Sequence, residues 1–133
     1  MSGNHSIKSF KDLEVYQNTY KTMLIVMKEV LPELPNNEKY DLKDQLSRAC
    51  KSIPRLIAEG YAKRHQKVGF QKYLDDAMSE SNETEVELMQ CKDLYFKEID
   101  PALSLTLAKE YDVIGRQIFR LREAWSKFSE KSL

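Results

Sequence analysis

Apolar residues recur at every third or fourth position through four long stretches of the chain. This spacing places them on one face of a helix, so each stretch predicts an amphipathic α-helix. The first stretch begins at Ser9, whose spacing to Asp12 fits a capping box, and it ends before Pro32. Its apolar stripe consists of Leu13, Tyr16, Tyr20, Met23, Leu24, Met27 and Leu31.

The second stretch predicts a helix from a cap at residues 36–37 to a turn near residues 64–65, with Pro54 in its interior. A proline there removes one amide donor and presses its ring against the carbonyl four residues back. The apolar positions nevertheless continue in register through Ile53 and Ile57, which a bundle can bury on either side of the proline. We therefore expect this helix to bend at Pro54 and to continue beyond it.

Two further stretches predict the remaining helices. The third runs from Phe70 to Tyr95. The fourth begins at Asp100 and Pro101, an N-cap acid followed by a proline at the first helical position. Its apolar residues follow a near-heptad spacing, which is typical of helices that pack side by side in a bundle.

The composition agrees with one helical domain. The 133 residues are 41% hydrophobic and 32% charged, with only four glycines and four prolines to form turns. We therefore expect an all-α fold, an antiparallel up-down-up-down four-helix bundle whose second helix is kinked at Pro54. The bundle is expected to be a single domain of residues 1–133 in which residues 1–8 fray.

The charges are balanced in number but unevenly distributed. The chain has 21 basic and 21 acidic residues, yet residues 1–72 hold 13 basic against 8 acidic ones. Residues 73–100 hold 2 basic and 9 acidic residues, and residues 101–133 hold 6 and 4. A nucleic-acid-binding domain is usually basic as a whole. This dipolar distribution suits self-association at least as well.

A second line of β-branched residues lies beside the apolar stripe of the first helix. Val15, Thr19, Val26 and Val30 form this line. Two interpretations are open: a wide face buried within one chain, or a candidate interface between subunits of an oligomer.

The sequence gives no sign of a membrane or secreted protein. No apolar run approaches the roughly 18 residues that span a bilayer. The opening residues MSGNHS have neither a basic region nor an apolar core, so we expect no secretion signal. Cys50 and Cys91 lack the spacing of a metal site, and we expect buried, reduced thiols in a cytoplasmic protein.

Residues that commonly carry catalysis do not occur in the required arrangements. A di-iron bundle needs two Glu-x-x-His pairs, but serine and alanine precede His5 and His65 at that spacing. No glycine-rich phosphate loop or Gly-x-Ser-x-Gly motif occurs. We interpret Glu80, Glu83 and Glu87 as a solvated helix face, because a hard cation needs further oxygen ligands. We therefore predict no catalytic residue, metal, cofactor or small-molecule substrate, and a protein that is not an enzyme.

The segment SIPRLIAEG at residues 52–60 resembles the signature SIPxNIAEG of four-helix-bundle proteins encoded in 23S rRNA intervening sequences. Other parts of that family's pattern are similar to FKDLEVYQ (10–17), LPNNEKYDLKDQLSRACKSI (34–53) and FQKYLDDAMSESNETEVEL (70–88). The resemblance covers residues 10–125. Leu56 replaces the asparagine of the signature, and Ser79 stands where many members have glycine. A polar role of that asparagine therefore does not carry over to this chain.

The resemblance implies a small helical protein that forms a homopentamer and is similar to the accessory protein of diversity-generating retroelements. It also implies RNA as a candidate partner. The basic residues that could bind RNA follow the second half of helix two and the next turn: Lys51, Arg55, Lys63, Arg64, Lys67 and Lys72. Alternatively, these basic residues form a solvated face and pair with acids of the third helix. The protein would then be a protein-binding scaffold or helper subunit without nucleic acid.

Overall fold

Four α-helices form most of the computed structural model, which describes residues 6–66 and 68–132, with side chains as far as residue 127. No strand occurs among these residues. The helices are α1 (Glu14–Ile25), α2 (Leu42–Ala62), α3 (Gly69–Leu94) and α4 (Pro101–Ser132). The prediction of an all-α fold with four helices is therefore confirmed.

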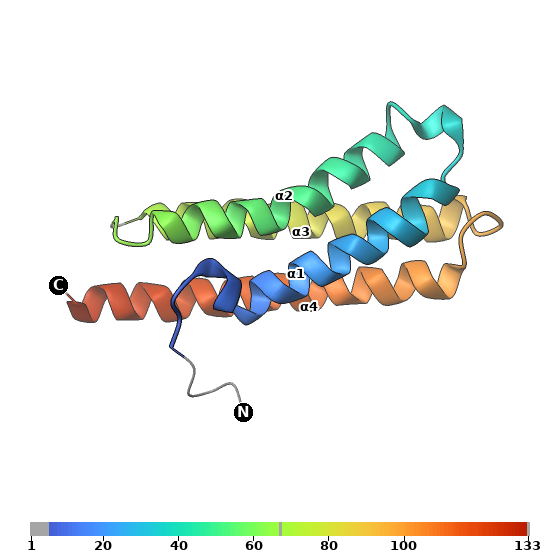
Figure 1. Ribbon diagram of the computed structural model, residues 1–133. Helices are drawn as coiled ribbons and strands as arrows, with labels where there is room; N and C mark the ends of the chain where they lie inside the picture. The colour runs from blue at the N-terminus through green and yellow to red at the C-terminus, as the bar shows by residue number, and fades with distance from the viewer. Residues whose placement is uncertain (1–5, 67, 133) are drawn as a thin grey trace.

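Figure 1 shows α2, α3 and α4 lying along one another, with each helix running opposite to the one before it. α3 packs along both α2 and α4, whereas the shorter α1 packs against α2 and α4 from one side. The α1–α2 and α3–α4 connections lie at one end of the molecule, and the α2–α3 turn lies at the other. Surface grooves lie between α1 and α2 and between α1 and α4.

The predicted cap of the first helix is present, but it closes a short turn that precedes α1. Ser9 Oγ accepts a hydrogen bond from the backbone N–H of Lys11 at 3.0 Å. In return, Asp12 Oδ2 accepts one from the backbone N–H of Ser9 at 3.0 Å, which completes the capping box. This box begins a 3-10 turn at Phe10, and the extended residue Leu13 separates the turn from α1.

The helix also changes its winding before its predicted end. α1 ends at Ile25 and continues as a π-helical turn, Val26–Val30, in which Leu31 N–H donates to the Val26 carbonyl. The following residue, Pro32, has no N–H to continue the helical ladder, and the chain leaves through a 3-10 turn. The prediction of one regular α-helix as far as Leu31 therefore holds only as far as Ile25.

The β-branched line of the first helix is part of the chain's own core. Thr19, Val26 and Val30 have no exposed surface, and Val15 is 5% exposed. Thr19 satisfies its buried hydroxyl within α1 by donating to the carbonyl of Tyr16 at 2.8 Å. α2 and α4 both pack on α1, and Val26 and Val30 of the following π-helical turn belong to the same core, so this wide face is covered within one chain. The interpretation of these four residues as a subunit interface is corrected accordingly.

α2 runs through Pro54 without interruption and buries Ile53 and Ile57 on either side of it. The ribbon of α2 changes direction near its middle (Figure 1). That Pro54 causes this bend stays a prediction. Beyond it, Gly60 allows a close approach to α3, because a Cβ atom there would lie 2.6 Å from Cβ of Tyr73.

Side-chain contacts connect the helices at both ends of the bundle. At one end, the Tyr95 hydroxyl donates to the carboxylate of Glu38, which joins the end of α3 to the α1–α2 connection. At the other end, the ring of Phe70 lies 5.1 Å from that of Trp125 and 6.0 Å from that of Tyr61. This aromatic cluster draws on α2, α3 and α4, so all three helices are fixed where the α2–α3 turn forms.

The predicted boundaries of the last two helices agree with the structure. The turn near residues 64–65 lies between the end of α2 and the start of α3. Pro101 is the first residue of α4, and Asp100 Oδ1 accepts a hydrogen bond from the N–H of Ala102 at 3.0 Å. Among the described residues, no helix combines the length and apolar character that crossing a membrane requires.

Candidate nucleic-acid interface

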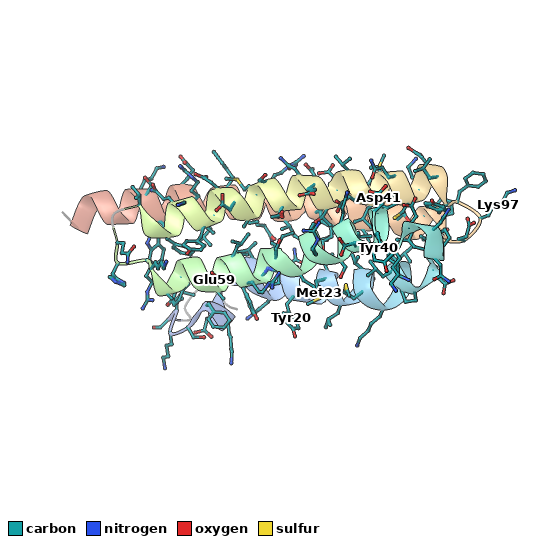
Figure 2. The ribbon with its side chains drawn as sticks, turned by 90° about the horizontal axis from the view of Figure 1, so that it is seen from above. Tyr20, Met23, Tyr40, Asp41, Glu59 and Lys97 are labelled. Atoms are coloured by element: carbon teal, nitrogen blue, oxygen red, sulfur yellow. The ribbon has the colours of Figure 1, made fainter. Side chains whose placement is uncertain are left out.

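A groove of about 510 Å³ lies between α1 and α2, and we call it the α1/α2 groove. On the α1 side it is lined by Phe10, Tyr16, Tyr20 and Met23. On the α2 side it is lined by Arg48, Lys51, Pro54, Arg55 and Ala58. Figure 2 shows Tyr20 and Met23 on α1 where this helix lies beside α2. One wall is therefore aromatic and the other is basic.

Helical spacing and the capped turn produce the aromatic wall. Tyr16, Tyr20 and Met23 are four and three residues apart, so they share one face of α1. Phe10, in the capped turn, meets Tyr16 edge to face, with ring centroids 4.9 Å apart and an interplanar angle of 79°. The rings of Tyr16 and Tyr20 are 6.0 Å apart and tilted by 36°. Tyr20 is 45% exposed, so its ring is open to solvent.

The basic wall consists of Arg48, Lys51 and Arg55, which lie on one face of α2 because they are three and four residues apart. Arg48 forms an ion pair with Asp44 at 3.3 Å, and 70% of its side chain is exposed. Exposed pairs of this kind contribute little to stability, so Arg48 can exchange its partner at low cost. Lys51 and Arg55 form no ion pair with the carboxylates of the described residues. Their charges are available to a negatively charged ligand.

The basic residues near the α2–α3 turn do not extend this wall. The Lys63 ammonium donates to the hydroxyl of Tyr73 at 3.0 Å and lies 5.1 Å from the centre of its ring. The Arg64 guanidinium lies 4.1 Å from the ring centre of Tyr61 and donates to the carbonyl of the same residue at 2.8 Å. Both cations are therefore engaged within the chain, as cation–π and hydrogen-bond partners of tyrosines.

Lys72 and Lys67 are the last two of the predicted basic residues. Lys72 is exposed on α3, and Lys67 lies outside the described residues. The five described residues of this set therefore do not share one face: two line the α1/α2 groove, two belong to the turn after α2, and one lies on α3.

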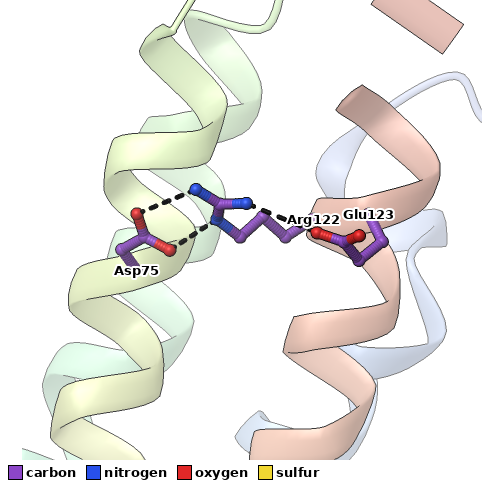
Figure 3. Close-up of polar contacts among 3 residues, drawn as sticks. All are labelled: Asp75, Arg122 and Glu123. Atoms are coloured by element: carbon purple, nitrogen blue, oxygen red, sulfur yellow. Dashed lines mark hydrogen bonds and ion pairs between the residues drawn. The ribbon is translucent and has the colours of Figure 1, made fainter. Parts of the chain in front are cut away.

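One acid of α3 pairs with a cation of α4 and not with the basic residues of α2. Asp75 Oδ1 lies 2.6 Å from Nε of Arg122, and Asp75 Oδ2 lies 3.3 Å from Nη2 of the same residue, a forked pair that joins α3 to α4 (Figure 3). Glu123 adds a longer contact of 3.5 Å to the same guanidinium. None of the ion pairs formed among the described residues joins an α3 acid to Lys51, Arg55 or Lys63.

Sequence reasoning missed most of the groove. Phe10 and Arg48 were not singled out, and Tyr16 and Tyr20 were assigned to a buried stripe. The helical phase of Arg48 with Lys51 and Arg55 was a signal that could have found the third cation. No sequence signal distinguished a solvent-facing tyrosine from a buried one, because both occur at the same helical spacing.

The interpretation of the α3 glutamates as a solvated face is correct for Glu83 but wrong for Glu87. Glu83 is exposed, and Glu80 is partly covered and accepts a hydrogen bond from Ser52 Oγ at 3.3 Å. Glu87 is 3% exposed, and neither of its carboxyl oxygens has a hydrogen-bond partner among the described residues. Burial, with the nearby charges of Glu83 and Glu80 adding, raises the pKa of Glu87 to about 8. This carboxyl is therefore protonated at neutral pH.

The thiols are also unsuited to chemistry at neutral pH. Cys50 and Cys91 are buried and free, as expected. Burial raises the pKa of each thiol to about 12, so the nucleophilic thiolate is scarce. In the part of the chain that the structure describes, no group of three or more His, Cys, Asp or Glu side chains is placed to hold a metal ion.

Comparison with known proteins identifies a family. The model of the 23S rRNA-intervening sequence protein family matches residues 11–120, from the capped turn before α1 to well inside α4. The chain belongs to the 23S rRNA-intervening sequence protein family. In this 23S rRNA-intervening sequence protein, the matched region includes the whole basic wall and every aromatic-wall residue except Phe10. No match to a curated protein or to a solved structure was found.

Proposed function

We propose that this protein is a non-catalytic, homo-oligomeric helical bundle that binds RNA weakly, through phosphate contacts of its basic wall. The observation that carries this proposal is the pair Lys51 and Arg55, which are exposed on one face of α2 without carboxylate partners among the described residues. Membership of the 23S rRNA-intervening sequence protein family supports RNA as the anionic ligand. Because phosphate contacts do not depend on base identity, we expect binding that tolerates many sequences and weakens as salt rises.

Titration of RNA at two salt concentrations tests this proposal. The double change Lys51→Ala and Arg55→Ala should weaken binding at low salt. For single-stranded RNA it should also make the salt dependence of log K shallower by about 0.7 for each phosphate contact that is lost. The triple change of Lys63, Arg64 and Lys67 to alanine should have a smaller effect, because tyrosines already engage the first two of these side chains.

A matched control removes two exposed cations outside the groove. Lys97 and Lys109 are both exposed, and neither lines the α1/α2 groove. Their double change to alanine alters the net charge by the same amount as the change of Lys51 and Arg55. Equal losses in the two double variants would show that only net charge matters. Absence of RNA binding at low salt would instead favour the protein-binding scaffold, which needs no nucleic acid.

We expect the subunits to form a closed ring of five. The uneven charge along the chain and the family resemblance support this assembly, and a ring would repeat the basic wall so that weak phosphate contacts add together. The interface must use residues other than the β-branched line of α1, because the chain buries that line itself. Light scattering coupled to size exclusion should give a mass near five chains. A monomer at micromolar concentration would contradict the assembly.

A further inference from the structure

The α1/α2 groove combines two features that recognise different parts of a nucleotide. Its basic wall, formed by Arg48, Lys51 and Arg55, suits phosphates. Its aromatic wall includes Tyr20, whose ring is open to solvent and can stack on a base. A surface that bound phosphates alone would not need an exposed aromatic ring beside the cations.

The exposure of Tyr20 is unusual for its place in the sequence. It belongs to the apolar stripe of the first helix, in which Leu13 and Met23 are only 5% and 9% exposed. Tyr20 is 45% exposed, whereas the other members of the stripe are buried or half-buried. Phe10 packs edge-on against Tyr16, which fixes that inner ring, so Tyr20 presents the open aromatic surface of the wall.

The dimensions of the groove agree with a ligand of nucleotide size. Its volume of about 510 Å³ lies within the range of roughly 300 to 1,000 Å³ that is usual for small-molecule sites. Arg48 and Arg55 are seven residues apart on α2, which corresponds to roughly 10 Å along the helix. Cations distributed over that length can contact phosphates on either side of a base that lies on Tyr20.

We propose that the α1/α2 groove binds single-stranded RNA by stacking one unpaired base on Tyr20 while the basic wall contacts the flanking phosphates. This inference rests on the proposed RNA-binding function and names the form of RNA that the site selects. A duplex keeps its bases stacked and paired, so it offers the groove phosphates but no free base face. The groove therefore favours single strands over duplexes.

Binding of an oligouridylate and of an RNA duplex of equal length tests the inference. Loss of one base–aromatic stack, from Tyr20→Ala, should weaken oligouridylate binding by roughly 5-fold to 150-fold. It should leave duplex binding and the salt dependence unchanged, because no phosphate contact is lost. Tyr20→Phe keeps the ring and should stay within about twofold of the original affinity.

Tyr40 provides a matched control for this substitution. It is 87% exposed, and the Lys39 ammonium lies 5.4 Å from the centre of its ring, but it lies outside the groove. Figure 2 shows it away from Tyr20, toward the end of the bundle. Tyr40→Ala therefore removes an exposed tyrosine beside a cation and should not change oligouridylate binding.

A second variant fills the groove without removing a charge or a ring. Ala58 lines the α2 side, and Ala58→Leu adds bulk with a residue that suits a helix interior. Oligouridylate binding should weaken in this variant while the helical circular dichroism signal is kept. Unchanged oligouridylate affinity in Tyr20→Ala would overturn the inference, whatever the effect of Ala58→Leu.

The outcomes separate this inference from the proposed function. If the change of Lys51 and Arg55 weakens binding but Tyr20→Ala does not, RNA binding stands and the stacking site is wrong. If neither RNA binds at low salt, the proposed function itself fails. If Tyr20→Ala lowers the mass in light scattering, the groove is occupied by a second copy of the chain, and this too overturns the inference.

Discussion

Replacing Glu87 with glutamine should make the stability of the bundle depend less on pH. The Glu87 side chain is 3% exposed on α3, and its carboxyl oxygens have no hydrogen-bond partner among the described residues. Ionising such a group in the folded chain is unfavourable, because water solvates the charge better than the interior does. Glutamine keeps the shape and the polarity of the side chain but cannot ionise.

The pKa of Glu87 determines the pH range of the effect. Burial, with the charges of Glu83 and Glu80 adding, raises this pKa from 4.5 to about 8. Below pH 4.5 the carboxyl is protonated in both the folded and the unfolded chain, so its full contribution to stability is present. Between the two pKa values only the folded chain holds the proton. The free energy of unfolding therefore falls by about 1.4 kcal/mol per pH unit in this range, and the loss is complete above the folded pKa.

The magnitude is bounded by the size of the shift. The full difference in pKa corresponds to a loss of about 5 kcal/mol between acid and alkaline conditions. The value of about 8 already includes the effect of Arg48 on α2, which favours the charged carboxylate and lowers the pKa. Water that enters beside the charge also lowers the cost, so we expect the original protein to lose about 2–4 kcal/mol through Glu87.

Urea unfolding followed by circular dichroism measures this loss at about pH 5 and about pH 9. Glu87→Gln should lie within about 1 kcal/mol of the original protein at the lower pH and exceed it at the higher pH by most of the loss given above. Glu29→Gln removes an exposed carboxyl from the π-helical turn, away from Glu87. It should not change the difference in unfolding free energy between the two pH values. An equal pH dependence in the original protein and in Glu87→Gln would refute the reasoning.

Further urea-unfolding measurements test other contacts. Gly60→Ala should lower stability by about 1–3 kcal/mol because its Cβ would lie 2.6 Å from an α3 side-chain carbon, whereas Gly115→Ala, with its nearest neighbour at 3.8 Å, should raise it by about 0.5–1 kcal/mol; equal effects would contradict this. Tyr111→Phe should raise stability by up to about 1 kcal/mol, because its buried hydroxyl has no partner among the described residues. Tyr95→Phe should lower stability, because it removes a hydrogen bond to the Glu38 carboxylate. A Tyr95→Phe variant that is more stable than Tyr111→Phe would refute this pair of predictions. Pro54→Ala should keep the helical circular dichroism signal and change stability only modestly, so loss of folding would show that the proline does more than bend α2.

Local signals predicted the helices well because their causes are local. The apolar spacing, the capping box at Ser9 and the Asp100–Pro101 start depend on residues a few positions apart, and the structure contains all of them. The π-helical turn at Val26–Val30 was not predicted. It contains no glycine or proline, so nothing in its residues distinguished it from a regular α-helix.

Which helix faces are buried was harder to predict. The apolar spacing shows which side of a helix faces the core, but not how many neighbouring helices cover it. Val15 and Val30 are both buried in the core of the chain, whereas an oligomer interface would have produced the same pattern in the sequence. Glu87 lies on the edge of α3 that is covered within the bundle, while Glu83, four residues earlier, is exposed. At the site, the exposure of Lys51 was predicted. Which tyrosines lie opposite it depends on how α1 and α2 are placed relative to each other, and the sequence pattern does not show that placement.

The groove connects the proline in α2 to the proposed function. Pro54 and Ala58 alternate with Lys51 and Arg55 on the α2 side of the groove, so small side chains lie between the charged ones. Pro54 costs α2 a backbone hydrogen bond, and a regular helix former at this position would avoid that cost. If the groove binds RNA, Pro54 contributes to the site as well as to the fold, because it lines the groove between the charged side chains of α2.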